Sequence, residues 1–255
     1  MKFLPKTRFE QVNIDKETDI TFSFMERGRF SSVFDKVYPE LRAIQKESKD
    51  KNECRTDYKK FLEGIHARDE KQLISAKKQI QDEWEKIGSD FLIALSEHFE
   101  TDWPADKKEI VGYVSVLPVF PRFLDDYSFF TGYKDIHGSI ETSAHEIVHF
   151  LWFKKWKEIF PETARKDFEN PNLVWRLSEI IDPIILQCNP KIKNLIKPRH
   201  WGYKSFESIK IDNIGVIEYF KDIYLKSVDS GDDFAATLKK LWEEAKKHEQ
   251  EISKF

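Results

Sequence analysis

Residues 143–152 read SAHEIVHFLW and contain two histidines four positions apart, His145 and His149. In an α-helix these side chains lie on one face, about 40° apart around the axis, so two imidazoles can reach one metal ion. Glu146 directly follows the first histidine, where its carboxylate can face a water on that ion. The opposite face carries small or apolar residues, which indicates a buried helix that turns its histidines toward a cleft.

The pattern His145-Glu146-Ile147-Val148-His149 resembles the HExxH signature of the zincin metallopeptidases. This resemblance implies a zinc-dependent hydrolase that acts on a peptide or protein substrate. It also implies a zincin-like core with a small sheet over the metal-binding helix. Two alternatives stay open. One is a zincin fold kept as a non-catalytic binding or regulatory module, and the other is a helical interaction protein without metal.

The third metal ligand decides which zincin subgroup the chain resembles. The extended metzincin pattern needs a glycine and then a histidine after the second histidine, but Trp152 and Lys155 stand there. In gluzincins a glutamate on a later helix completes the site, and Glu179 is the best candidate. The expected helix around it, residues 172–182, is largely apolar, and an ionised carboxylate there is costly unless it is paired or binds metal. The alternative is an ion pair with Arg176, one turn earlier.

Four further side chains receive expected roles. Asp182, on a similar face to Glu179, is expected to accept an imidazole N–H and so orient a metal ligand. Glu146 is expected to take a proton from a zinc-activated water as general base and pass it to the leaving amine. His200, and after it Tyr203, are candidates for stabilising the oxyanion. The Arg-His-Trp run around them is also typical of a helix cap with a packed aromatic ring.

The sequence departs from the best-known gluzincins in two places. Ser178 precedes Glu179 where an asparagine is usual, and no Gly-Ala-Met-Glu-like motif precedes the metal helix. These departures put aminopeptidase activity in doubt and leave endopeptidase or small-peptide hydrolysis open. His137 lies in the expected loop 134–139 before the metal helix, where it is a candidate for contact with substrate.

Helical spacing of apolar residues predicts an α+β protein that is mostly helical. The helical pattern covers residues 30–100, with an exposed connection at 46–55, and returns at 214–226 and 233–255. We therefore divide the chain into three parts: an N-terminal mainly helical region (1–105), a zincin-like metal-binding core (106–190) and a C-terminal helical region (191–255).

Three strands are predicted. Residues 20–24 alternate between apolar and polar side chains, residues 110–120 are rich in β-branched and aromatic residues, and a short strand ends at Gly132. Pro118 cannot donate a ladder hydrogen bond, which favours an edge position for the strand at 110–120. In zincins such an edge strand binds an extended peptide substrate. A strand fully paired inside the sheet is the alternative.

Composition narrows the classes of partner. Charged residues make up 34% of the chain and the net charge is -3 with interspersed signs, so neither nucleic acid nor a membrane is expected as partner. Cys54 and Cys188 form no CxxC pair, which predicts free thiols. Pro5, Lys6 and Arg8 interrupt any N-terminal secretory signal, and no stretch has the length of a membrane span. We therefore expect a soluble, cytoplasmic protein.

Overall fold

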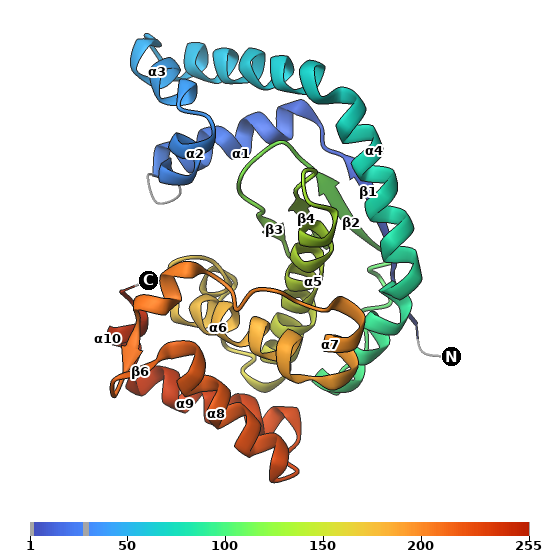
Figure 1. Cartoon of the computed structure of the whole chain (residues 1–255). Coiled ribbons are helices and arrows are strands. Elements are labelled where there is room, and N and C mark those ends of the chain that lie inside the picture. Colours follow the sequence, from blue (N-terminus) through green and yellow to red (C-terminus); the bar gives the residue numbers. More distant parts are fainter. Residues whose placement is uncertain (1–2, 28–30, 255) are drawn as a thin grey trace. The chain divides into compact units, whose positions relative to one another are not determined.

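The computed structural model describes residues 3–27 and 31–254, which form two compact units. The sheet unit comprises residues 6–86 and 109–143, and the helical unit comprises residues 3–5, 87–108 and 144–254. Two helices, α4 (Lys51–Phe99) and α5 (Ile136–Ile159), contribute residues to both units (Figure 1). The chain is mostly helical and carries a small mixed sheet, which confirms the expected α+β class.

The sheet unit contains a four-stranded sheet in the order β1-β2-β4-β3. Its strands are β1 (Lys6–Gln11), β2 (Glu109–Val114), β3 (Arg122–Phe123) and β4 (Ser128–Thr131). Figure 1 shows β2 between β1 and β4, and it pairs in parallel with both, whereas β3 is antiparallel to β4.

The expected strand at 110–120 is therefore an interior strand. The edge position that Pro118 favoured is wrong, because β2 ends at Val114 and the proline lies beyond the hydrogen-bonded ladder. The short strand expected before Gly132 is confirmed as β4. The strands β1 and β3 were not predicted; β3 has only 2 residues, too few for any periodic pattern.

Three helices follow β1 in the sheet unit: α1 (Ile14–Arg27), α2 (Ser31–Val37) and α3 (Glu40–Glu47). The strand expected at 20–24 is wrong, since these residues lie within α1. The buried positions Glu17, Thr21 and Met25 recur every four residues, which is helical spacing. The side chain of Asn13 accepts the backbone N–H of Asp15 at 2.7 Å and so favours a helix start here. Phe30, where the expected helical pattern begins, lies outside the described residues.

The exposed connection expected at 46–55 is shorter than predicted. Helix α3 ends at Glu47 and α4 begins at Lys51. The Oδ1 atom of Asp50 accepts the backbone N–H groups of Asn52 and Glu53 at 2.8 and 2.9 Å. This N-terminal cap starts α4 inside the charge-dense stretch, where composition alone indicated a loop.

The loop expected at 134–139 is also shorter, because α5 begins at Ile136. The Oδ1 atom of Asp135 accepts the N–H of Gly138 at 3.1 Å, and its backbone carbonyl accepts the N–H of Ser139 at 2.8 Å. His137 therefore lies in the first turn of α5 and not in a loop.

The helical unit is built around one central helix. Its elements after α5 are η1 (Arg165–Phe168), α6 (Leu173–Cys188), α7 (Pro190–Ile196), η2 (Lys204–Ser208), β5 (Lys210–Ile211), β6 (Ile214–Gly215), α8 (Val216–Asp229), α9 (Phe234–Lys247) and α10 (Glu249–Ile252). Helix α6 contacts η1, α7, α8, α9 and α10, and each residue from Val174 to Leu186 is buried. The helix expected at 172–182 is confirmed as α6. The helix expected at 214–226 begins only at Val216, because Ile214 and Gly215 form β6, and the single helix expected from residue 233 is divided at His248 into α9 and α10.

Aromatic side chains fix α5 within the helical unit. The Trp152 ring contacts Phe99 and Phe234 edge-on, with centroids 6.5 and 6.1 Å apart, and Trp156 packs on Trp242 at 5.0 Å. Rings of this size bury large apolar areas and hold a helix in one rotation. The face of α5 that carries the two histidines is thereby fixed toward α6.

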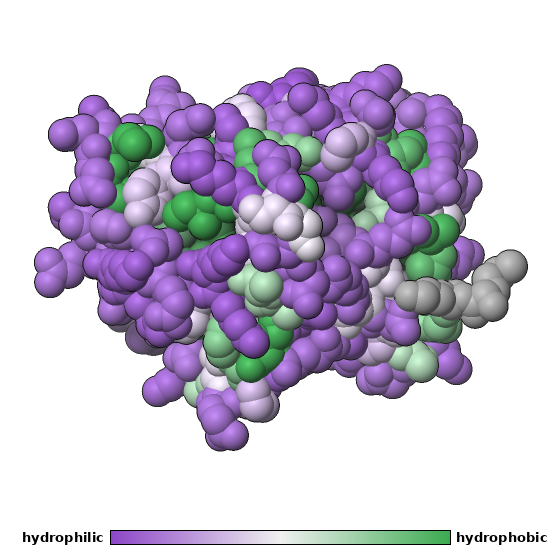
Figure 2. Space-filling view, turned by 90° about the horizontal axis from the view of Figure 1, so that it is seen from below, coloured by the Kyte–Doolittle hydropathy of each residue, from purple (hydrophilic) through white to green (hydrophobic). Residues whose placement is uncertain are grey.

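The surface is polar, as the composition indicates. Figure 2 shows one face on which hydrophilic residues predominate and apolar residues gather in small groups. Among the described residues, no helix combines the length and the apolar character that crossing a membrane requires.

Candidate metal centre

Three of the expected ligands meet in the helical unit. His145 and His149 come from α5 and Glu179 from α6. The Nε2 atom of His145 lies 3.1 Å from Oε2 of Glu179, and Nε2 of His149 lies 3.4 Å from Oε1. The two imidazole Nε2 atoms are 3.3 Å apart. The structure therefore brings together two neighbouring turns of one helix and a carboxylate from the next.

These distances fit a shared metal ion. A tetrahedral zinc site with bonds of 2.0–2.1 Å places neighbouring donor atoms about 3.3–3.4 Å apart. The three measured separations lie between 3.1 and 3.4 Å, and donor atoms of all three residues lie within 4.8 Å of one another. Two imidazoles and one carboxylate form a donor set that zinc and several other divalent metals accept. The residues present therefore fit such an ion.

The electrostatics of the cluster show what the three groups do to one another. Burial alone would lower the pKa of His145, but the hydrogen bond and charge of Glu179 outweigh it and raise the pKa to about 9. Burial alone would raise the pKa of Glu179, but the charges of the two imidazoles hold it well below its usual value. The carboxylate is thus ionised and attracts a positive charge at the point where the imidazole nitrogens converge.

Asp182 lies where the sequence places it. Its Oδ2 atom is 2.8 Å from Nδ1 of His149, and both side chains are fully buried. The contact is one of charge, because among the described residues neither oxygen of Asp182 accepts a hydrogen bond. A metal on Nε2 of His149 would place the proton of this ring on Nδ1, which faces the carboxylate.

Phe153 is a further contact that the sequence did not single out. Its ring stacks on His149, with centroids 5.7 Å apart and planes inclined by 12°. It stands four residues after His149 on α5, so helical spacing alone was sufficient to identify it. The stacking holds the imidazole from the side that Asp182 does not contact.

The alternative partner of Glu179 is engaged elsewhere. Arg176 donates from Nε to the carbonyl of Pro171 at 2.7 Å and from Nη1 to the carbonyl of Ile252 at 3.1 Å. Pro183 does not end α6, as the helix continues to Cys188. Because a proline has no N–H, it cannot donate to the carbonyl of Glu179 one turn before it.

The cluster is buried except at one residue. The side chains of His149 and Glu179 are 0% and 2% exposed, whereas that of His145 is 18% exposed. Glu146 is 7% exposed, and its charge contributes to the raised pKa of His145, so its carboxylate lies near that ring. Solvent therefore reaches the cluster at the His145 side.

His200 and Tyr203 lie in the loop between α7 and η2. The side chain of Gln187 on α6 donates to the carbonyls of Pro198 and His200 at 3.0 and 3.2 Å, so this loop follows the end of α6. Tyr203 is 39% exposed, caps η2 and packs on Phe206 with centroids 5.8 Å apart. This is the capped, packed arrangement that the sequence left open, and a role in the chemistry stays a prediction for both residues.

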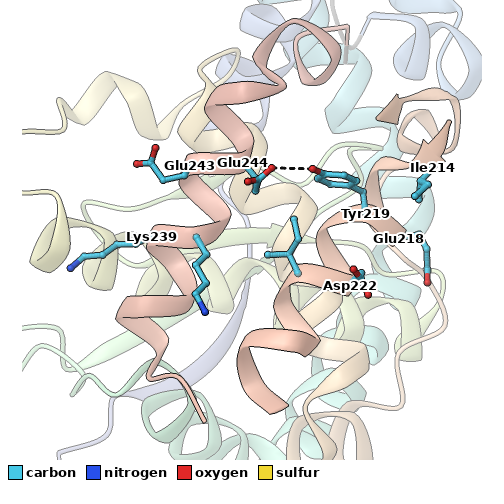
Figure 3. A pocket seen from close by; sticks show the side chains of 9 residues that line it. Ile214, Glu218, Tyr219, Asp222, Lys239, Glu243 and Glu244 are labelled. Atoms are coloured by element: carbon cyan, nitrogen blue, oxygen red, sulfur yellow. Dashed lines mark hydrogen bonds between the residues drawn. The ribbon is translucent and has the colours of Figure 1, made fainter. Parts of the chain in front are cut away.

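A separate groove lies between α8 and α9 in the same unit. It has a volume of about 910 Å³, and Figure 3 shows Tyr219 and Lys239 on its two walls. The Tyr219 hydroxyl donates to Glu244 at 3.0 Å across the groove. None of the expected site residues lines it.

Comparison of the chain with models of protein families, with curated proteins and with solved structures gave no match. The candidate function therefore rests on the motif and on the geometry of these side chains.

Proposed function

We propose that this protein is a zinc metallopeptidase in which His145, His149 and Glu179 hold the metal and Glu146 is the general base. The observation that carries the proposal is the convergence of three residues from an HExxH helix and the following α-helix. The two imidazole Nε2 atoms are 3.3 Å apart, and they lie 3.1 and 3.4 Å from the two oxygens of Glu179. Zinc is the metal that this motif suits best. The zincin-like core at 106–190 and the gluzincin subgroup belong to the same proposal.

A zinc ion bound here would lower the pKa of a water molecule toward about 7 and polarise a substrate carbonyl. Glu146 would accept a proton from this water at its carboxylate and return it to the amine of the departing product. It is suited to this because it adjoins His145, the one ligand that solvent reaches. Asp182 and Phe153 keep His149 in place throughout, so the ligand set needs no rearrangement.

The interior position of β2 changes how a peptide would bind. Both sides of β2 are paired, with β1 and with β4, so a substrate strand cannot add to it. We propose that the substrate instead approaches from the exposed side of His145. Whether His200 or Tyr203 then stabilises the oxyanion is part of this proposal and needs a separate test.

A second candidate is the non-catalytic metal-binding module. The observation that favours it is the burial of His149 and Glu179, which is typical of closed structural sites. The two candidates differ in the role of Glu146, because a structural site has no need of a general base.

The test combines metal content with peptide hydrolysis. Zinc is measured by elemental analysis of the purified protein, and turnover is measured on a library of fluorescence-quenched peptides. Glu146→Gln is expected to keep zinc and to lower turnover by about 10²- to 10⁴-fold, the usual contribution of a general base. Glu141→Gln is the matched control, since Glu141 lies on the same helix and is 8% exposed against 7% for Glu146.

Three results decide between the candidates. Zinc together with peptide hydrolysis that depends on Glu146 supports the peptidase. Bound zinc without cleavage of any peptide supports the non-catalytic module. Absence of zinc after purification and after incubation with the metal refutes both.

A further inference from the structure

Lys16 on α1 lies against aromatic rings of the sheet unit. Its Nζ atom lies 4.2 Å from the ring centroid of Tyr113 on β2 and 4.2 Å from that of Phe123 on β3. The centroid of Phe130 on β4 is 5.9 Å away. All three distances are within the roughly 6 Å at which a ring attracts a cation. One ammonium group therefore contacts rings from three strands.

The three rings form a continuous wall. Phe130 packs against Tyr113 with centroids 5.8 Å apart and against Phe123 with centroids 5.9 Å apart. Tyr113 and Phe130 are paired in the register of β2 and β4, so their side chains lie side by side on one face of the sheet. Phe130 is fully buried and anchors the other two rings. We call Tyr113, Phe123 and Phe130 the aromatic cage.

We propose that the aromatic cage is a binding site for a methylated or quaternary ammonium group, and that Lys16 is its resident occupant. Rings arranged around a cation on several sides are the means by which proteins recognise such groups. Lys16 enters from a helix, not from the sheet, so its long side chain can leave the cage while the rings stay in place.

The electrostatics of the cage favour an alkylated ammonium over a primary one. Burial lowers the pKa of Lys16, which means that the cage removes water from the ammonium. A trimethylammonium group loses less hydration on burial, because it has no N–H groups to hydrate. It therefore gains the attraction of the rings at a lower cost of desolvation.

The rim of the cage indicates which source of ammonium fits. The carboxylate of Asp126, an exposed residue, acts on Lys16 and favours its charged form. The same carboxylate would repel the phosphate of a phosphocholine group. The cage is thus better suited to a methylated lysine side chain of a peptide than to a phosphocholine headgroup.

The experiment removes the occupant and adds probes. Binding to wild type and to Lys16→Ala is followed by the NMR shifts of the aromatic side chains, with choline and its neutral isostere 3,3-dimethylbutanol. Lys16→Ala is expected to bind choline at least tenfold more tightly than wild type does, and choline at least fivefold more tightly than the isostere. Lys134→Ala is the matched control, because Lys134 lies over a single ring, Tyr133, at 5.5 Å.

Two further probes distinguish the sources. Trimethyllysine amide is expected to bind Lys16→Ala more tightly than phosphocholine does, and Asp126→Asn should reduce this preference. Equal binding of choline to wild type and Lys16→Ala, or equal binding of choline and its isostere, would overturn the proposal that the aromatic cage binds an ammonium group. A preference for phosphocholine would overturn the choice of a peptide side chain.

A measurement on wild type covers the case that Lys16→Ala does not fold. Reductive methylation with ¹³C-formaldehyde converts lysines to dimethyllysines, whose methyl signals report on nearby rings. The methyl signals of Lys16 are expected to shift upfield of those of the other lysines. If the methyl signal of Lys16 has the same chemical shift as those of the other lysines, the cage does not hold an alkylated ammonium.

Discussion

Two buried glutamates, one in each unit, meet histidines in different ways. In the sheet unit, Glu17 accepts hydrogen bonds from the Ser115 hydroxyl at 2.6 Å and the Val116 N–H at 3.0 Å, and its second oxygen lies 2.5 Å from Nε2 of His66. In the helical unit, each oxygen of Glu179 faces an imidazole, and the two imidazole nitrogens are themselves 3.3 Å apart. Both glutamates are almost completely buried.

The difference separates a structural carboxylate from a candidate metal ligand. A hydroxyl and a backbone N–H are fixed donors, so Glu17 joins α1 to the segment after β2 and needs no ion. At Glu179 an imidazolium N–H on His145 can be shared with the carboxylate and with the second imidazole, and a divalent cation bound at this point would take the place of that proton. Glu179 is the candidate metal ligand of the two because two imidazole nitrogens share its carboxylate.

The largest effect is expected on metal binding. Glu179→Ala removes one of three ligands, and we expect zinc affinity to fall by about a thousandfold or more, roughly 4 kcal/mol. Glu17→Ala should keep the zinc content of the folded protein unchanged. Competition with a chelator measures both, with near-UV circular dichroism to confirm folding. Equal zinc affinity in wild type and Glu179→Ala would remove Glu179 from the site.

The second prediction concerns the stability of the protein, on which Glu17 is expected to have the larger effect. Glu17→Ala leaves the Ser115 hydroxyl and the Val116 N–H without their shared acceptor, and we expect the free energy of unfolding to fall by about 3 kcal/mol. Urea unfolding measures this. Asp19→Ala on the same helix is the control: its pair with Arg55 is exposed, and the change should stay below about 1 kcal/mol. Similar losses in both variants would contradict the structural role of Glu17.

A smaller loss of zinc affinity is expected when Asp182 is changed. Asp182→Asn keeps the shape of the side chain but weakens its hold on His149, and we expect zinc affinity to fall about 10- to 100-fold. Cys188→Ser, also on α6 and outside the cluster, serves as control. If the asparagine variant binds zinc as tightly as wild type does, the contact at 2.8 Å does not orient the ligand.

The smallest effect is expected at a third imidazole, that of His98. His98 packs among Phe99, Tyr224 and Phe234, and burial lowers its pKa to about 4, whereas Glu179 raises that of His145 to about 9. Between pH 4 and 6.5 the unfolded chain binds more protons at His98 than the folded protein does. Its contribution is therefore complete above pH 6.5 and is lost as the pH falls toward 4.

Over this range the free energy of unfolding should fall by about 1–2 kcal/mol. This is less than the full pKa shift implies, because the His98 ring is partly exposed. Urea unfolding at pH 7 and pH 4.5 measures the loss. In His98→Gln the difference between the two pH values should shrink by the same amount. An unchanged difference would show that His98 titrates normally in the folded protein.

The candidate site was more predictable than the fold around it. His145 and His149 meet because helical geometry places residues four apart on one face, which sequence alone dictates. Glu179 was identified from the cost of a carboxylate in an apolar helix, and the structure places it within reach of both imidazoles. Periodicity also identified α6, α8 and α9, because long amphipathic or buried segments carry many independent positions.

The segments whose structure was predicted wrongly are those determined by a few side-chain hydrogen bonds or by distant strand pairing. The side chains of Asn13 and Asp50 accept one and two backbone hydrogen bonds at helix starts, and these local bonds outweigh an alternation over five residues or a run of charges. The pairing of β2 depends on β1, about a hundred residues earlier, and no local pattern contains this information. The position of the loop with His200 depends likewise on a contact from Gln187.

Helix α5 has a practical consequence for anyone who wishes to cut this protein into pieces. The boundary between the compact units falls between Ser143 and Ala144, inside the first half of the helix, and only Ala144 separates it from His145. A fragment that begins there would start with unpaired backbone N–H groups at the very residues that carry the motif, and its first turn would fray. Limited proteolysis or truncation at this boundary is therefore expected to disrupt the turns that carry the two histidines. A fragment that folds independently must include the whole helix, from Asp135 onward.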